Sequence, residues 1–262
     1  MLAAVAAAIF AGTSAAVARA DPPADVFAGA GVFIDNPLNF PGPWALASEL
    51  QAAHFSWVAM HVDDELGLEL ADPMWIDTFR LHGLSVGIWG AEGPSVITDV
   101  AVADLAVRTL GADFYIADAE RLFERTKGGL WSRSAQFVSA FRELQPTLPA
   151  ALVTYGAAKV PWILPIDFAA WRKGGFELLP EAYYNQSHDY RPDLTVAHAL
   201  RAGWSIDQVH PVIGVFRHYA AWHYVPMLQQ VGTRGFSVYL ADQATASDFA
   251  ALAGLAAATV AG

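Results

Sequence analysis

The sequence predicts an α/β protein built as a single (β/α)8, or TIM, barrel. From residue 31 onward, short apolar segments alternate eight times with helix-like segments, which is the element count of such a barrel. The central segments are nearly continuous Val, Ile, Phe and Ala, as expected for parallel strands covered on both faces. An open doubly wound sheet is the main alternative. It usually carries a glycine-rich phosphate loop after its first strand, where this chain has Asp35-Asn36-Pro37-Leu38-Asn39.

The expected elements follow one another without a linker, a charge block or a low-complexity tract that would divide the chain. The apolar segments expected as strands are Gly31–Asn36, Ser56–Asp63, Ser85–Trp89, Asp113–Glu120, Pro149–Tyr155, Leu178–Tyr184, Val209–Phe216 and Phe236–Leu240. The amphipathic or Ala-rich segments expected as helices are Pro43–His54, Pro73–His82, Val96–Leu110, Ser132–Leu144, Ile166–Arg172, Val196–Ala202, His218–Val231 and Ser247–Val260. We therefore expect one barrel domain over residues 21–262.

Composition excludes several classes of function. The net charge of −11 argues against binding to nucleic acid or to anionic lipid, and it suits a neutral or weakly charged substrate. Cysteine is absent, so a disulfide, a thiolate nucleophile and a Cys-ligated zinc site are excluded. The eight histidines show no HExxH or other tight ligand spacing, and no Gly-x-Ser-x-Gly elbow occurs. We expect no metal, no cofactor and no serine-hydrolase chemistry.

The first twenty residues resemble a secretion signal. Leu2 to Phe10 is an apolar run, and Ala18-Arg19-Ala20 forms a small-residue cleavage site before Asp21. The alternatives are a retained Ala-rich helix or a start codon placed too early. We expect residues 1–20 to be a signal peptide and the protein to be secreted or extracytoplasmic. The run is too short for a confident membrane span, so stable membrane insertion is not expected.

The segment Phe114–Glu120 offers the best lead to function, because an apolar strand ends there in Asp118 and Glu120. Side chains at positions i and i+2 of a strand share a face, and each residue advances the chain by about 3.3 Å. The two carboxylates would leave the backbone roughly 6–7 Å apart and raise each other's pKa. The alternative is a loop in which they form salt bridges with Arg121 and Arg125.

Polar and aromatic residues gather at the ends of the other expected strands, where the active site of a barrel lies. These residues are Asp35, Asn36, His61, Asp63, Asp64, Trp89, Glu92, Thr154, Tyr155, Glu181, Tyr183, Asn185, Gln186, Arg217, His218, Asp242 and Gln243. Carboxylates and amides bind sugar hydroxyls, and aromatic faces stack on sugar rings. We expect substrate contacts from Asp35, Asp63, Trp89, Glu181, Tyr183, Asn185 and Asp242.

Each of these candidates also has a structural interpretation. Asp35 could cap a turn, Asp242 could cap the last helix, and Asp63 could begin a solvated loop. Trp89 could pack inside the barrel instead of facing a sugar. Glu181, Tyr183 and Asn185 share strand parity, which favours a common face.

An Asp closing strand one, Asp-x-Glu closing strand four and an Asp closing strand eight resemble the family 25 glycoside hydrolases, lysozyme-type muramidases, or a glycoside-hydrolase-like barrel related to them. The matching residues here are Asp35, Asp118, Glu120 and Asp242. The resemblance implies that Glu120 is the general acid and that Asp118 orients a substrate N-acetyl group or stabilises an oxocarbenium-like transition state. It also implies that Asp35 and Asp242 line the sugar subsite.

The leading hypothesis is a retaining or substrate-assisted glycosidase that acts on a peptidoglycan-type glycan, with the raised pKa at Glu120. A non-catalytic carbohydrate-binding or structural barrel, such as a phage-tail component, is the first alternative. The second is a divalent-metal hydrolase that uses Asp35, Asp118, Glu120 and Asp242 as oxygen ligands. The sequence does not select an oligomeric state.

Overall fold

The computed structural model describes residues 25–62, 71–120, 123, 130–156, 166–217 and 219–261. Eight parallel strands close into a barrel in chain order, so the predicted (β/α)8 architecture is confirmed. The strands are β1 (Gly29–Ile34), β2 (Phe55–His61), β3 (Ser85–Ala91), β4 (Tyr115–Asp118), β5 (Ala150–Tyr155), β6 (Phe176–Ala182), β7 (Val212–Gly214) and β8 (Gly235–Tyr239). The expected signal peptide and Asp63 lie outside the described residues.

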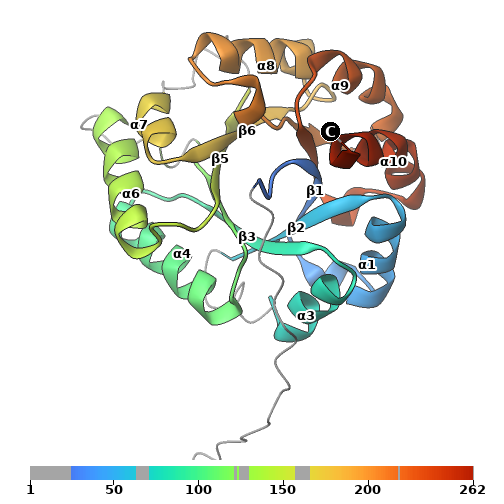
Figure 1. The fold of residues 1–262 in the computed structure, drawn as a ribbon, viewed down its shortest axis with the longest axis horizontal. Helices are drawn as coiled ribbons and strands as arrows, with labels where there is room; N and C mark the ends of the chain where they lie inside the picture. Colours follow the sequence, from blue (N-terminus) through green and yellow to red (C-terminus); the bar gives the residue numbers. More distant parts are fainter. Residues whose placement is uncertain are drawn as a thin grey trace, which may run out of the picture.

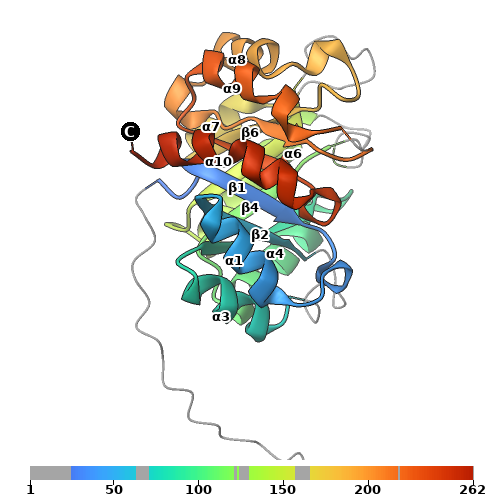
Figure 2. The same ribbon diagram turned by 90° about the vertical axis from the view of Figure 1, so that its right-hand side faces the viewer.

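The helices form a ring around the strands, also in chain order (Figure 1). They are α1 (Pro43–Ala52), α3 (Pro73–Leu81), α4 (Val96–Leu110), α6 (Leu130–Leu144), α7 (Phe168–Lys173), α8 (Pro192–Arg201), α9 (Val225–Val231) and α10 (Ala246–Ala261). Figure 2 shows α10 lying across β1, which it contacts. The closing helix thereby covers β1 and the neighbouring β2. Among the described residues, no helix combines the length and the hydropathy needed to cross a bilayer.

Two apolar cores hold the barrel together, one between the sheet and the helices and one inside the barrel. The inner core pairs very small residues with large rings. A Cβ atom on Gly31 would lie 1.8 Å from the Trp57 ring, and one on Gly87 would lie 2.2 Å from the Phe114 ring. The barrel interior is therefore filled by rings that only glycine neighbours admit, and it is a packed core up to the site at its C-terminal end.

Several element boundaries differ from those expected from sequence. β6 begins two residues earlier than predicted, at Phe176, and β7 is confined to Val212–Gly214. Pro211 has no N–H to donate, so the regular ladder of β7 starts after it, and Val209 makes only an isolated bridge to Leu178. The helix expected from residue 218 begins at Val225.

Candidate functional site

A cavity of about 540 Å³ opens at the C-terminal ends of the strands. Side chains from several strands and the loops that follow them line it: Phe33, Trp89, Asp118, Glu120, Val153, Tyr155, Glu181, Tyr183, Gln186, Tyr190, Val212, Phe216, Arg217, Tyr239, Leu240 and Gln243. Of the residues expected at the site, Asp118, Glu120, Trp89, Glu181 and Tyr183 line this one cavity. The structure thus brings together the carboxylate pair and three of the expected substrate contacts.

The backbone that carries Asp118 and Glu120 is held to the next strand. β4 ends at Asp118, but the Ala119 N–H still donates to the Val153 carbonyl at 3.0 Å. The Thr154 hydroxyl donates to the Ala119 carbonyl at 2.8 Å. Ala119 is fully buried on the opposite face, in the core between sheet and helices. Strand parity therefore continues to Glu120, and both carboxylates face the cavity.

Glu181, on β6, is the carboxyl group with the strongly raised pKa. Its side chain is 7% exposed, and burial is the largest cause of the increase. A hydrogen bond to Glu120 and the negative charges of Glu120 and Asp118 raise the pKa further, while a hydrogen bond from Tyr183 opposes them. The sequence predicted the raised pKa at Glu120. The structure shows a strongly raised pKa at Glu181, which is buried beside Glu120.

Aromatic rings wall the cavity around these acids. The Tyr183 and Tyr239 rings stack at 5.7 Å between centroids, and Phe33 contacts both Trp89 and Tyr239 edge to face. Burial followed by the nearby carboxylates raises the pKa of Tyr239, and the same causes raise the pKa of Tyr190 to about 12. Both phenols therefore keep their protons at neutral pH and remain hydrogen-bond donors.

Asp35 and Asp242 do not line this cavity, although the sequence placed both in the sugar subsite. Asp35 pairs with His61 at 2.9 Å, and the His61 ring stacks on Trp89 at 4.0 Å between centroids. Asp35 therefore holds the His61 ring that stacks on Trp89, and its charge also helps to raise the pKa of Tyr239. Asp242 accepts a hydrogen bond from Asn39 at 2.8 Å, which ties the loop after β8 to the loop after β1.

Asn185 supports the wall of the cavity from behind. Its side-chain amide donates to the Phe216 carbonyl at 3.1 Å, and its carbonyl oxygen accepts from the Tyr224 hydroxyl at 3.3 Å. β6 ends at Ala182, so the parity that groups Glu181 with Tyr183 no longer applies three residues later.

Tyr190 and Tyr239 are the polar cavity residues that sequence reasoning missed, beside the apolar Phe33, Val153, Val212, Phe216 and Leu240. Tyr239 ends β8 and shares strand parity with Ser237, so the period-2 pattern of that strand was a usable signal. Tyr190 belongs to a short 3-10 turn after β6, Ser187 capping it. No spacing in the sequence relates that turn to the strand ends.

The arrangement suits the binding and protonation of a hydroxyl-rich ligand. It offers a buried carboxyl group with a raised pKa, two further carboxyl groups, phenol donors and aromatic faces. Metal chemistry at this site has less support. Among the described residues, the one group whose ligand atoms lie close enough to share an ion contains none of Asp35, Asp118, Glu120 and Asp242.

No family model and no curated protein matches the chain. Several solved structures, however, match the chain. A family 18 glycoside hydrolase (GH18) chitinase from Cycas revoluta in complex with (GlcNAc)3 superposes with a TM-score of 0.65 and 12% identity, over 89% of this chain and 100% of that chain. A chitinase from Chromobacterium violaceum superposes with a TM-score of 0.63 and 11% identity, over 87% of this chain and 99% of that chain.

The similarity also extends to the BexX/CysO complex from Amycolatopsis orientalis, at a TM-score of 0.53 and 15% identity, over 87% of this chain and 89% of that chain. At such identities the likeness establishes the fold and leaves the chemistry to the residues of the site. The glycoside hydrolases found are of family 18, so the narrower resemblance to family 25 has no support among them. The chain has the (β/α)8 barrel fold that the Cycas and Chromobacterium chitinases also have.

Proposed function

We propose that the protein is a glycoside hydrolase that cleaves a cell-wall glycan containing N-acetylglucosamine. The observation that carries the proposal is the carboxyl cluster in the cavity: Glu181 is buried with a raised pKa, and it is hydrogen-bonded to Glu120 beside Asp118. Glycoside hydrolysis needs one carboxyl group that holds a proton and one that stays charged. The sugar in the proposal follows the (GlcNAc)3 held by the similar Cycas barrel.

Glu120 is the proposed general acid. It is half-buried and lines the cavity, so it can reach a glycosidic oxygen, and its hydrogen bond with Glu181 keeps a proton between the two carboxyl groups. Asp118, on the same face of the same strand, is the proposed charged partner. It would orient the substrate N-acetyl group or stabilise positive charge at the sugar carbon.

The aromatic wall is the proposed binding surface for the sugar. Trp89, Tyr183 and Tyr239 present rings to the cavity. Their faces would stack on the apolar side of a pyranose while phenol groups donate to its hydroxyls. A cavity of about 540 Å³ lies within the range of small-molecule sites, roughly 300–1,000 Å³, and holds a short stretch of glycan.

Glu120→Gln tests the catalytic role. We expect its kcat on chito-oligosaccharide and on purified peptidoglycan to fall by about 100-fold or more, the contribution typical of a general acid. Glu143→Gln, an exposed carboxylate on α6, is the matched control and should keep wild-type activity. Glycan cleavage by Glu120→Gln at the wild-type rate would refute the assignment of Glu120 as the general acid.

A carbohydrate-binding barrel without turnover, such as a phage-tail component, is the second candidate. It is favoured by the engagement of Glu120 with Glu181, because a carboxyl bound by another carboxyl is less free to protonate a substrate. The same experiment separates the two functions. Wild-type protein that binds the glycan but releases no reducing ends would support the binding function.

We also propose that the protein works outside the cytoplasm. The support is the pattern of residues 1–20, with its apolar run and its Ala18-Arg19-Ala20 site. Expression of the full chain with mass determination of the exported product tests this proposal. A product that begins at Asp21 is the expected result, and retention of the intact chain in the cytoplasm would contradict it.

A further inference from the structure

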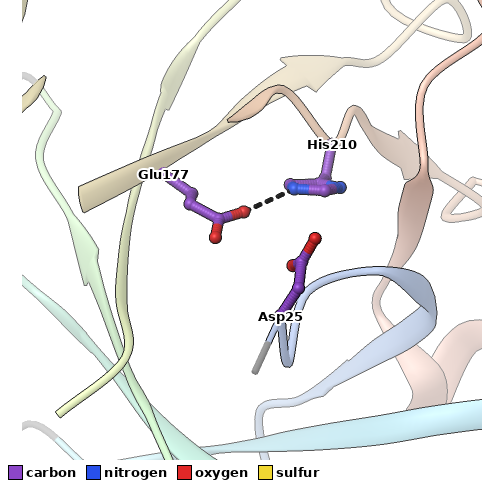
Figure 3. A group of neighbouring side chains, drawn as sticks. All are labelled: Asp25, Glu177 and His210. Carbon is purple, nitrogen blue, oxygen red and sulfur yellow. Dashed lines mark hydrogen bonds and ion pairs between the residues drawn. The ribbon is translucent and has the colours of Figure 1, made fainter. Parts of the chain in front are cut away.

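Three ligand-type side chains meet at the end of the barrel opposite the cavity. Asp25 lies in the turn before β1, Glu177 is the second residue of β6, and His210 lies two residues before β7. Figure 3 shows the two carboxylates pointing toward the His210 ring, with the Glu177–His210 contact drawn as a dashed line. One ligand atom from each residue lies within 4.8 Å of the others. The proposed glycosidase mechanism uses none of them.

His210 is the centre of this group. It is fully buried, and its Nε2 lies 2.5 Å from Glu177 Oε2. Its Nδ1 is also buried and has no hydrogen-bond partner among the described residues. A buried polar atom without a partner is costly. An imidazole with one nitrogen on a carboxylate and the other unfilled matches a metal-binding histidine, in which the carboxylate orients the ring and raises its basicity.

Asp25 is held in place by groups that leave it able to bind a cation. Its Oδ1 accepts from the Ala28 N–H at 3.0 Å, and its Oδ2 pairs with Arg234 at 3.0 Å. Each carboxylate oxygen has two lone pairs, so both oxygens keep a site for a ligand. Metal-binding carboxylates are commonly oriented by such outer partners.

The group is open to ions on one side. The side chains of Asp25 and Glu177 are 21% and 24% exposed, whereas His210 is closed off from solvent. An ion can therefore approach through the two carboxylates and reach the imidazole. The two carboxylate groups beside the imidazole attract a divalent cation, and Arg234 offsets part of the charge of Asp25.

We propose that Asp25, Glu177 and His210 form a structural site for a divalent transition-metal ion of the zinc type, with His210 Nδ1 and Asp25 as ligands and Glu177 as the carboxylate that orients the imidazole ring. Imidazole nitrogen mixed with carboxylate oxygen suits zinc and its neighbours. Calcium would require six to eight oxygens, more than this group supplies. The ion would join the turn before β1 to the starts of β6 and β7, far from the glycan cavity, and so would act on stability.

Zinc binding to the full chain without an affinity tag tests the site. Isothermal titration with ZnCl₂ after treatment with EDTA should show one tight site per chain, and zinc should raise the melting temperature. Glu177→Gln and Asp25→Asn should each lower the zinc affinity by at least about tenfold, the smaller effect seen when even an outer-shell partner is lost. Asp193→Asn is the matched control, because that carboxylate is also ion-paired and partly exposed but lies outside the group.

If one of the two carboxylate variants fails to fold, the other still tests the proposal. Each removes a partly exposed group and leaves His210 in place. No tight zinc binding by the wild type would overturn the proposal. Equal zinc affinity in the wild type and in both variants would overturn it too, since the zinc would then sit at other histidines. Glycan cleavage is measured separately on the same samples, so its absence would leave the zinc result standing.

Discussion

The carboxyl group of Glu181 on β6 hydrogen-bonds to that of Glu120, which lies two residues past the end of β4. The two residues are 61 positions apart in the sequence. The contact raises the pKa of Glu181, because burial, the hydrogen bond to Glu120 and the charges of Glu120 and Asp118 all disfavour its ionisation.

The first prediction concerns the pH dependence of stability. The folded-state pKa of Glu181 is raised above its usual 4.5, so between 4.5 and the folded value the native state binds one more proton than the unfolded chain. Stability from this group is full below pH 4.5 and is lost as pH rises through the folded pKa. Glu181→Gln, which cannot ionise, should therefore gain stability relative to the wild type by up to roughly 1.4 kcal/mol per pH unit within that window.

Urea unfolding of both proteins at several pH values from about 4 to 8 measures this difference. A stability difference that stays constant across the range would show that Glu181 ionises normally in the folded state.

The second prediction concerns Tyr183, whose hydroxyl donates to Glu181 and partly offsets the rise in the Glu181 pKa that burial and the nearby carboxyl groups cause. Tyr183→Phe removes this donor and keeps the ring. The pKa of Glu181 should rise further, which moves the loss of stability to higher pH. Infrared titration of the protonated carboxyl band, with Tyr155→Phe as the comparison in the same cavity, measures the shift. A downward movement of the titration midpoint would contradict the hydrogen bond.

The third prediction concerns the aromatic wall. Trp89 lines the cavity and stacks on His61. Trp89→Leu should weaken binding of chito-oligosaccharide by about tenfold or more, because buried tryptophans at binding sites carry much of the affinity. Trp44→Leu removes a tryptophan that is 58% exposed on α1 and lies outside the cavity, and it should leave the affinity unchanged. Equal affinity losses in both variants, measured by calorimetry, would refute the assignment of Trp89.

The fourth prediction concerns packing inside the barrel. A Cβ atom on Gly31 would lie 1.8 Å from the Trp57 ring, so Gly31→Ala should lower the free energy of unfolding by about 1–3 kcal/mol or more. Gly254→Ala, on an open face of α10, should instead raise it by about 0.5–1 kcal/mol. Urea denaturation of the two variants compares them. Stabilisation by Gly31→Ala would mean that the Trp57 ring can move aside.

Much of the barrel could be predicted from the chain, because each strand and helix is encoded by local periodicity. The parity of Asp118 and Glu120 was readable for the same reason, and both side chains face the cavity. The start of a strand was less predictable where a proline lies next to it, as at Pro211 directly before β7. Asn185 shows the limit of parity, since its side chain turns behind the wall once the strand has ended.

The sequence by itself determined the fold class, the acid pair on the fourth strand and the end of the barrel at which to look. Only the tertiary structure showed that the pKa of Glu181 is strongly raised, because its burial and the approach of Glu120 depend on how β4 and β6 are placed around the barrel. It also decided that Asp35 and Asp242 stand outside the cavity, and that Asp25, Glu177 and His210 meet at the opposite end. Local sequence sets the direction of each side chain along its own strand, whereas closure of the barrel sets the distances between strands.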